Sequence, residues 1–198
     1  MEDKITVRLP NGKLISNVPK GINKKELLNK YEMHEYTNFL KKYEGLELTA
    51  YKLKHPDGSE EEHNTIGFGH YGSDVQDGLT ITERQASNVL RNDIEKRLPA
   101  VRKAIPKFET FSIENKKNLL GSWFRGSLTP TGSKETIRLI NEGKYKEASK
   151  MFLKHQKYLT KWKPQKDRLL KANKDVSNSV ATRMEETAAA ISRLDGNN

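Results

Sequence analysis

Two short stretches organise this sequence: Tyr43-Glu44-Gly45-Leu46 and, further along, Thr65-Ile66-Gly67-Phe68-Gly69-His70. Ahead of the first stretch, apolar residues recur at positions 36, 39, 40 and 43, a spacing that places them on one face of a helix. Gly45 follows immediately, and glycine is the residue type that most readily ends a helix. The sequence therefore predicts a helix that ends at Glu44.

The second stretch has the pattern of a short strand. Before it, Leu48, Ala50 and Tyr51 favour another strand, and the polar residues 54–64 favour a loop between the two. The glycines on either side of Phe68 allow other parts of the backbone to approach closely. We expect a strand-loop-strand unit after the helix, and a cleft between the helix and this hairpin.

The start of the chain shows a different pattern. Apolar and polar residues alternate over 5–9, Pro10-Asn11-Gly12 supplies a turn, and a second extended segment follows over 14–18. This order predicts a β-hairpin. Asn23, with Glu26 three residues later, has the spacing of a capping box and predicts a short helix.

The rest of the chain is predicted to be helical. Thr82 with Gln85 forms a second capping box, which begins a helix through about Arg97. Further helices are expected over 112–125, 133–142, 144–159 and 179–193. We therefore expect an α+β fold that is mostly α, with residues 1–31 as a hairpin-helix module and 32–198 as the main domain.

Composition narrows the possible functions. The 198 residues carry a net charge of +10, and eleven Lys or Arg residues lie within 144–174, so the protein should be drawn to polyanions such as wall polymer or nucleic acid. The absence of cysteine excludes disulfides, thiolate metal sites and cysteine nucleophiles. The first twenty residues lack the pattern of a signal peptide, and no stretch is apolar enough to span a bilayer.

Glu44 is a candidate for acid catalysis. Cleavage of a glycosidic bond requires one carboxylic acid to protonate the leaving oxygen and usually a second carboxylate. Glu44 can be the acid if packing withdraws it from water. On local pattern alone, a solvated helix-end glutamate, an ordinary strand residue at Thr65 and a packed or exposed ring at His70 are the commoner explanations. No metal is expected, because His70 has no partner at metal-ligand spacing.

Together with Tyr51, the two stretches resemble the phage-type lysozymes of glycoside hydrolase family 24. Weaker similarities continue through 81–86 and 139–148, so the resemblance covers about residues 35 to 195. It implies a lysozyme-like fold with a small β lobe and a helical lobe, and a muramidase that needs no cofactor or metal. Residues 1–31 loosely resemble hairpin starts of phage structural proteins, which suggests docking to another virion protein.

The resemblance also implies roles for single residues. Glu44 would be the proton donor, and Thr65 would hold the catalytic water or the second carboxylate. His70 closes the motif, and we expect it to contact the substrate. The family usually has an aspartate two residues after the tyrosine that matches Tyr51, whereas this sequence has Leu53 there.

Two loop residues are candidates for the second carboxylate. Asp57 lies in a Pro-Asp-Gly turn that presents its carboxylate at a loop tip, and Glu60 lies five residues before Thr65, near the family's usual offset. At least two of the three glutamates at 60–62 are expected to be solvated residues of an acidic loop. If neither candidate serves, the protein would be slow, inactive, or a lytic transglycosylase in which a hydroxyl of the sugar attacks.

The leading prediction is a phage-encoded peptidoglycan hydrolase that cleaves the β-1,4 bond between N-acetylmuramic acid and N-acetylglucosamine. It would be carried in the virion or kept in the host cytoplasm before release, and would act on the cell wall. The alternative is a weak or inactive lysozyme-fold protein that binds peptidoglycan or has a structural role in the virion. Specific nucleic-acid binding is not expected, since no reader motif accompanies the charge of +10.

Overall fold

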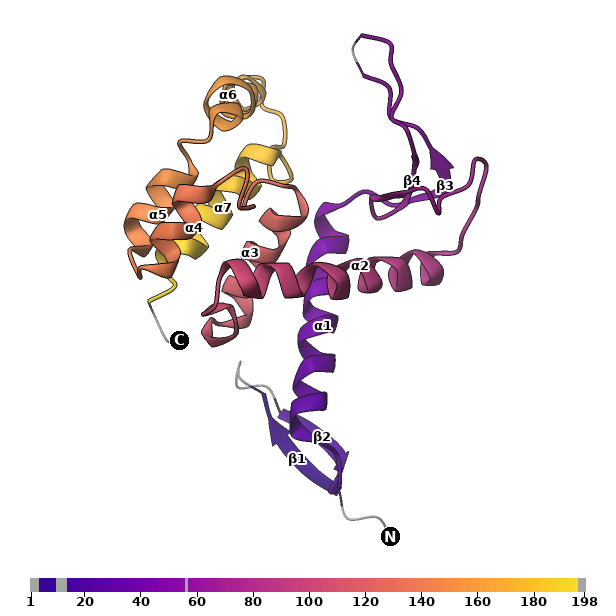
Figure 1. The fold of residues 1–198 in the computed structure, drawn as a ribbon, viewed down its shortest axis with the longest axis vertical. Coiled ribbons are helices and arrows are strands. Elements are labelled where there is room, and N and C mark those ends of the chain that lie inside the picture. Colours follow the sequence, from indigo (N-terminus) through magenta and orange to yellow (C-terminus); the bar gives the residue numbers. More distant parts are fainter. Residues whose placement is uncertain (1–3, 10–13, 56, 196–198) are drawn as a thin grey trace. The chain divides into compact units, whose positions relative to one another are not determined.

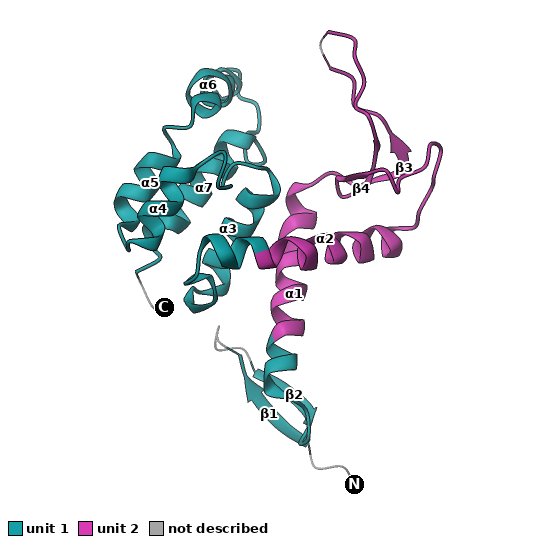
Figure 2. Ribbon diagram, in the orientation of Figure 1, with its two compact units in different colours: residues 1–28, 100–198 teal, residues 29–99 magenta. Residues whose placement is uncertain are grey.

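The computed structural model describes residues 4–9, 14–55 and 57–195. Contacts divide the chain into two compact units (Figure 2). One unit comprises Met1–Leu28 and Ala100–Asn198, and the other comprises Asn29–Pro99. The candidate site residues Glu44, Thr65 and His70 all belong to the second unit.

The unit Asn29–Pro99 combines parts of two long helices with a small sheet (Figure 1). The helices are α1 (Lys24–Tyr43) and α2 (Glu83–Ala104), and the strands are β3 (Glu47–Tyr51), β4 (Asn64–Gly67) and β5 (His70–Gly72). The strands pair antiparallel in the order β3-β4-β5. The predicted strand-loop-strand unit is confirmed, and β5 extends it by a strand that the sequence pattern did not indicate.

Helix α1 corrects one expectation. The short helix predicted after Asn23 and the helix predicted from Tyr36 are a single helix of 20 residues. No glycine or proline lies between Lys24 and Tyr43 to interrupt it. The predicted N-cap is confirmed, because Asn23 Oδ1 accepts hydrogen bonds from the backbone N–H groups of Lys25 (2.9 Å) and Glu26 (3.4 Å). The expected domain boundary at residue 31 falls inside this helix, and the division itself stays a prediction.

The N-terminal hairpin is confirmed. β1 (Lys4–Arg8) and β2 (Leu14–Pro19) pair antiparallel, with Val7 opposite Ile15. The turn predicted at Pro10-Asn11-Gly12 lies outside the described residues.

Helix α2 begins at the predicted capping box. The Thr82 N–H donates to Gln85 Oε1 at 2.8 Å, and the Gln85 N–H donates to Thr82 Oγ1 at 3.2 Å. The helix passes the predicted end near Arg97 and continues through Pro99 to Ala104. Its apolar residues Leu90 and Ile94 are fully buried, so packing stabilises this face of the helix.

In the unit formed by Met1–Leu28 and Ala100–Asn198, the described residues after Ala100 form helices joined by loops. The unit contains α3 (Ile113–Phe124), α4 (Lys134–Asn141), α5 (Tyr145–Phe152), α6 (Lys163–Lys171) and α7 (Val180–Ser192). α7 packs against α3 and α5, and α4 packs against α5. Among the described residues, no helix has the length and apolar character needed to cross a membrane.

One predicted helix in this part is too long. The helix expected over 144–159 ends at Phe152, where the Lys154 N–H bonds to the Met151 carbonyl and tightens the chain into a turn. A π-helical turn (Tyr158–Trp162) and α6 follow, and the sequence pattern indicated neither. The helices predicted over 112–125, 133–142 and 179–193 are confirmed.

Alanine substitutions at two glycines with different surroundings test how closely β4 packs against α2. Gly67 (φ +65°) and Gly69 (φ +85°) are both left-handed, but a Cβ at Gly67 would lie 3.3 Å from Ala86 Cβ, whereas a Cβ at Gly69 would meet nothing within 4 Å. Gly69→Ala should lower the free energy of unfolding by about 1–2 kcal/mol through backbone strain alone. Gly67→Ala should lower it further, as urea unfolding followed by circular dichroism would measure. Equal losses would contradict the close contact between β4 and α2.

Candidate active site

Glu44 lies between the end of α1 and the first strand of the sheet, β3. Its backbone N–H donates to the Leu40 carbonyl at 2.9 Å, which continues the helical pattern for one residue beyond Tyr43. Carboxylate oxygen Oε1 of Glu44 is buried. β3 begins three residues later at Glu47, and the predicted placement at a helix C-terminus is confirmed.

Thr65 lies in the middle of a row of side chains that crosses the sheet. It pairs with Tyr51 on β3 and with Tyr71 on β5, and directly paired residues lie on the same face of a sheet. Thr65 is buried, while Tyr51 and Tyr71 are 38% and 46% exposed. The threonine is therefore flanked by two exposed rings that combine an apolar face with a hydroxyl group, which suits contact with sugars.

Tyr51 keeps its proton over a wider pH range than an ordinary tyrosine. Partial burial raises its pKa, and the negative charges of Glu47 and Glu61 raise it further. At neutral pH its hydroxyl therefore remains available as a hydrogen-bond donor.

Contacts between α1 and the strand motif hold the two predicted stretches close together. Lys41, three residues before Glu44, places its Nζ 5.2 Å from the centre of the Phe68 ring. Register adds a second link, because Glu47 pairs with Gly67, two residues beyond Thr65. The segment around Glu44 therefore contacts the segment around Thr65 at two points, one before Glu44 in the chain and one after it.

The two candidates for the second carboxylate have local partners in the hairpin loop. Asp57 Oδ1 accepts hydrogen bonds from the Ser59 N–H at 3.0 Å and the Ser59 hydroxyl at 2.6 Å, and these bonds lower the pKa of Asp57. Glu60 forms an ion pair with Lys54 at 3.2 Å. A catalytic role for either residue stays a prediction.

His70 is held between two carboxylates. Its Nδ1 lies 2.9 Å from Asp93 Oδ2 on α2, and its Nε2 lies 3.2 Å from Asp74 Oδ2. The His70 and Asp93 side chains are only 15% and 10% exposed, whereas that of Asp74 is 71% exposed. The His70–Asp93 contact ties β5 to α2, and the predicted substrate contact of His70 stays a prediction.

The sequence reasoning missed Tyr71, Asp74 and Asp93. Tyr71 directly follows the motif, so a third strand after Gly69 would have revealed it. Asp93 is separated from His70 by 23 residues, and no local pattern links the two.

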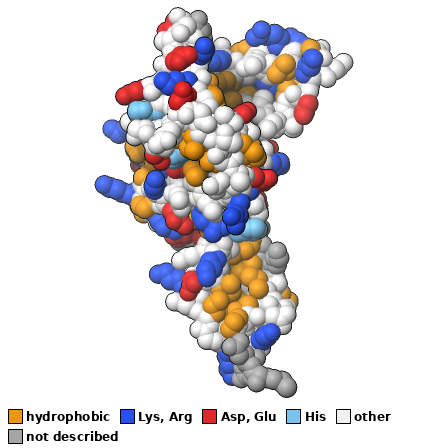
Figure 3. Space-filling view, turned by 90° about the vertical axis from the view of Figure 1, so that its right-hand side faces the viewer, with side chains coloured by type: hydrophobic (Ala, Val, Ile, Leu, Met, Phe, Trp, Pro, Cys, Tyr) orange, Lys and Arg blue, Asp and Glu red, His pale blue; other side chains and the backbone are white. Residues whose placement is uncertain are grey.

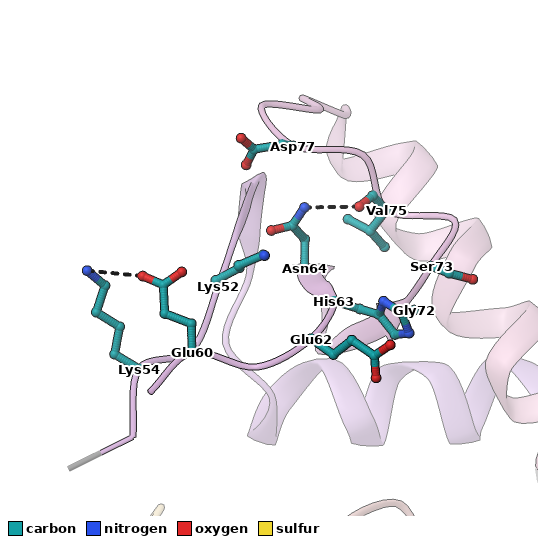
Figure 4. A pocket seen from close by; sticks show the side chains of 10 residues that line it. All are labelled: Lys52, Lys54, Glu60, Glu62, His63, Asn64, Gly72, Ser73, Val75 and Asp77. Carbon is teal, nitrogen blue, oxygen red and sulfur yellow. Dashed lines mark hydrogen bonds and ion pairs between the residues drawn. The ribbon is translucent and has the colours of Figure 1, made fainter. Parts of the chain in front are cut away.

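A pocket of about 520 Å³ lies beside these residues in the same unit (Figure 4). Its lining comes from both arms of the hairpin and from the segment after β5. The lining residues are Lys52, Lys54, Glu60, Glu62, His63, Asn64, Gly72, Ser73, Val75 and Asp77. Apart from Glu60, the sequence reasoning gave none of these residues a site role.

Sequence comparisons identify similar proteins. Residues 41–172 match the family model described as phage lysozyme. The endolysin of Bacillus phage PZA is 37% identical over 108 residues, which cover 54% of this chain and 39% of the endolysin. The endolysin of Bacillus phage B103 is 32% identical over 120 residues, which cover 61% of this chain and 43% of the endolysin. The matched region thus spans less than half the length of these curated relatives.

Solved structures show the same fold at low identity. The muramidase domain of SpmX from Asticaccaulis excentricus superposes with a TM-score of 0.52 at 21% identity, covering 81% of this chain and 95% of that domain. A mutant of P22 lysozyme superposes with a TM-score of 0.51 at 20% identity, covering 79% of this chain and 94% of the other. The predicted lysozyme-like fold, α+β and mostly α, is confirmed.

The two carboxylates at His70 should differ in their effect on stability. Asp93→Ala leaves a buried imidazole nitrogen without its charged partner and should lower the free energy of unfolding by about 2 kcal/mol. Asp74→Ala removes an exposed partner and should cost less than about 1 kcal/mol. Urea unfolding of the two variants at neutral pH compares them directly. A larger loss for Asp74→Ala would show that the His70–Asp93 contact does not hold β5 to α2.

The contribution of Asp74 should depend on pH. The hydrogen bond from His70 lowers the pKa of Asp74, so this carboxylate stabilises the fold above its ordinary pKa and loses that contribution as the pH falls through its folded-state value. The difference in free energy of unfolding between wild type and Asp74→Asn should therefore be present at neutral pH and disappear in acid. Unfolding curves from about pH 7 to about pH 2, well below the ordinary pKa of an aspartate, would measure it. A difference that widens on acidification would contradict this assignment.

Proposed function

Because this chain belongs to the phage lysozyme family, we propose that it hydrolyses the β-1,4 bond between N-acetylmuramic acid and N-acetylglucosamine in bacterial peptidoglycan. The observation that carries the proposal is the register of the small sheet. It places Thr65 between the exposed rings of Tyr51 and Tyr71, and it pairs the end of β4 with the start of β3, just after Glu44. This arrangement supports Glu44 as the acid, Thr65 as the hydroxyl group that acts beside it, and the two rings as a surface for the sugars.

In the proposed mechanism, Glu44 donates a proton to the oxygen of the leaving sugar. Its partly buried carboxyl group, at the fixed junction of α1 and β3, suits a general acid. The Thr65 hydroxyl orients the attacking water, and Tyr51 and Tyr71 contact the sugar rings on either side. The proton then returns to Glu44 from solvent after the product leaves.

We propose Asp57 or Glu60 as the carboxylate that activates the water. Both belong to the hairpin loop that follows β3, and the chemistry would require the chosen residue to leave its local partner, Ser59 or Lys54. If this residue faces Glu44 across the sugar at about 6.5–9.5 Å, the reaction inverts the anomeric carbon. Retained configuration at the new reducing end, or a 1,6-anhydro product, would overturn the inverting route.

One observation favours a second candidate function. Leu53 occupies the position where a carboxylate was expected, and both loop candidates already have partners. A lysozyme-fold protein that binds peptidoglycan without cleaving it would show this arrangement. The activity measurement below separates the two functions.

We also propose a phage setting for this activity. The matched endolysins of two Bacillus phages support an enzyme that acts on the cell wall. Storage in the virion or in the host cytoplasm before release is part of this proposal. The hairpin β1–β2 would then dock to another virion protein. Support comes from its exposed Ile5 and Leu14, 39% and 53% accessible, and Figure 3 shows hydrophobic side chains gathered over this hairpin.

Release of reducing ends from purified peptidoglycan tests the proposed hydrolase. Glu44→Gln cannot donate the proton and should lower the rate by at least about 100-fold, and one of Asp57→Asn and Glu60→Gln should do the same. Glu114→Gln is the matched control, since this exposed glutamate lies on α3 and pairs with Lys117. Its rate should equal that of wild type.

Each outcome of this measurement selects one reading. Loss of activity in Glu44→Gln alone would exclude both loop carboxylates and favour a water held by Thr65 alone. Wild-type protein that sediments with peptidoglycan but releases no reducing ends at any pH would replace the hydrolase by the binding protein.

A further inference from the structure

Asn64 on β4 and Gly72 on β5 both line the pocket of Figure 4. Asn64 pairs with Gly72, whereas the next residue, Thr65, pairs with Tyr71. Successive residues of a strand point to opposite faces, so the Asn64–Gly72 pair faces away from the Thr65 row. The Asn64 side of the pocket therefore faces away from the Thr65 row, and Glu60 is the one lining residue that the proposed hydrolysis also uses.

Asn64 is the residue that gives this pocket a ligand-binding character. The residue is only 6% exposed, and its Nδ2 donates to the Val75 carbonyl at 3.1 Å. Within the described residues its Oδ1 is buried and accepts no hydrogen bond. Figure 4 shows this oxygen turned away from Val75, toward the side of the pocket that Lys52 lines. A buried carbonyl oxygen of this kind needs a donor, and a ligand in the pocket can supply it.

The charges around Asn64 indicate which donor fits. Glu62 and Asp77 bring two exposed carboxylates to the pocket, and Lys52 brings an ammonium group. Lys54 and Glu60 pair with each other at 3.2 Å. An ammonium group on the ligand can donate to the Asn64 oxygen and to the carboxylates, while a carboxylate on the same ligand can reach Lys52. The described residues include no cluster of three or more His, Cys, Asp or Glu arranged to hold a metal ion, which favours an ammonium over a metal.

The edge of the sheet connects this pocket with the Thr65 face. β5 is an outer strand, while the far side of β3 is covered through the Ala50 N–H bond to the Leu79 carbonyl at 2.8 Å. His63 lines the pocket, and the centre of its ring lies 5.4 Å from that of Tyr71, which belongs to the Thr65 row. A flexible branch of a substrate bound along the Thr65 row can therefore pass around β5 into the pocket.

We propose that this pocket binds the peptide stem of peptidoglycan, with an ammonium group of the stem on Asn64, Glu62 and Asp77 and a stem carboxylate on Lys52. The inference rests on the proposed function, because it takes the glycan of the same polymer as the substrate on the other face. The stem branches from the muramic acid next to the bond that is cleaved. Binding of the stem would restrict the enzyme to glycan strands that carry peptides.

Binding of the soluble tripeptide L-alanyl-γ-D-glutamyl-L-lysine to the full chain tests the pocket, by calorimetry or by amide shifts in NMR spectra. Glu62→Gln and Asp77→Asn each remove one charge-assisted hydrogen bond at an exposed position and should weaken binding about tenfold. The matched control is Glu61→Gln, which changes the residue beside Glu62 that does not line the pocket. Its affinity should equal that of wild type, as should the affinity of Glu44→Gln.

A second ligand tests the assigned chemistry. The same tripeptide acetylated at both amino groups should lose its binding, since it no longer carries an ammonium group. Equal binding of the acetylated tripeptide, or equal weakening by Glu61→Gln, would overturn the assignment. If wild type releases reducing ends but does not bind the tripeptide, the proposed pocket is rejected and the proposed hydrolase stands. If wild type binds the tripeptide but releases no reducing ends, the pocket stands and the hydrolase is rejected.

Discussion

Backbone pairing of β4 with β3 on one side and β5 on the other fixes the positions on which the candidate site depends. Thr65 acquires its two tyrosine neighbours only through this pairing, and Glu47 comes to lie opposite Gly67. Since side chains alternate between faces along a strand, a shift by one residue would exchange Thr65 with Asn64. The Gly67 contact with Ala86 and the His70 contact with Asp93 hold this sheet to α2.

The same alternation gives the sheet two chemically different faces. One face carries the buried Thr65 hydroxyl between two exposed rings, which suits sugars. The other carries a buried amide oxygen at Asn64 among charged residues, which suits a zwitterionic group. Peptidoglycan contains both kinds of group within one repeating unit, so under the proposed function this small sheet would contact the glycan on one face and its peptide branch on the other.

The hairpin loop after β3 is the part of the candidate site where this sequence departs from the residues that the family resemblance implies. Leu53 stands where an acidic residue was expected, and the loop turns back through the Asp57–Ser59 bonds and the Lys54–Glu60 pair. These partners are close in sequence, so Asp57 and Glu60 are each held by another residue of the loop. A carboxylate taken from this loop has to exchange such a local partner for water or substrate.

The sequence by itself determined the hairpin β1–β2, the N-cap of α1, the capping box of α2, the end of α1 next to Glu44 and the family, because these rest on local hydrogen bonds and on motifs of a few residues. It did not determine the continuity of α1 or the strand β5. Only the tertiary structure decided that Tyr71 flanks Thr65, that Asp93 holds His70 and that Asn64 lines a pocket. These contacts join residues on different strands and helices, and their partners depend on register and packing, which no local pattern encodes.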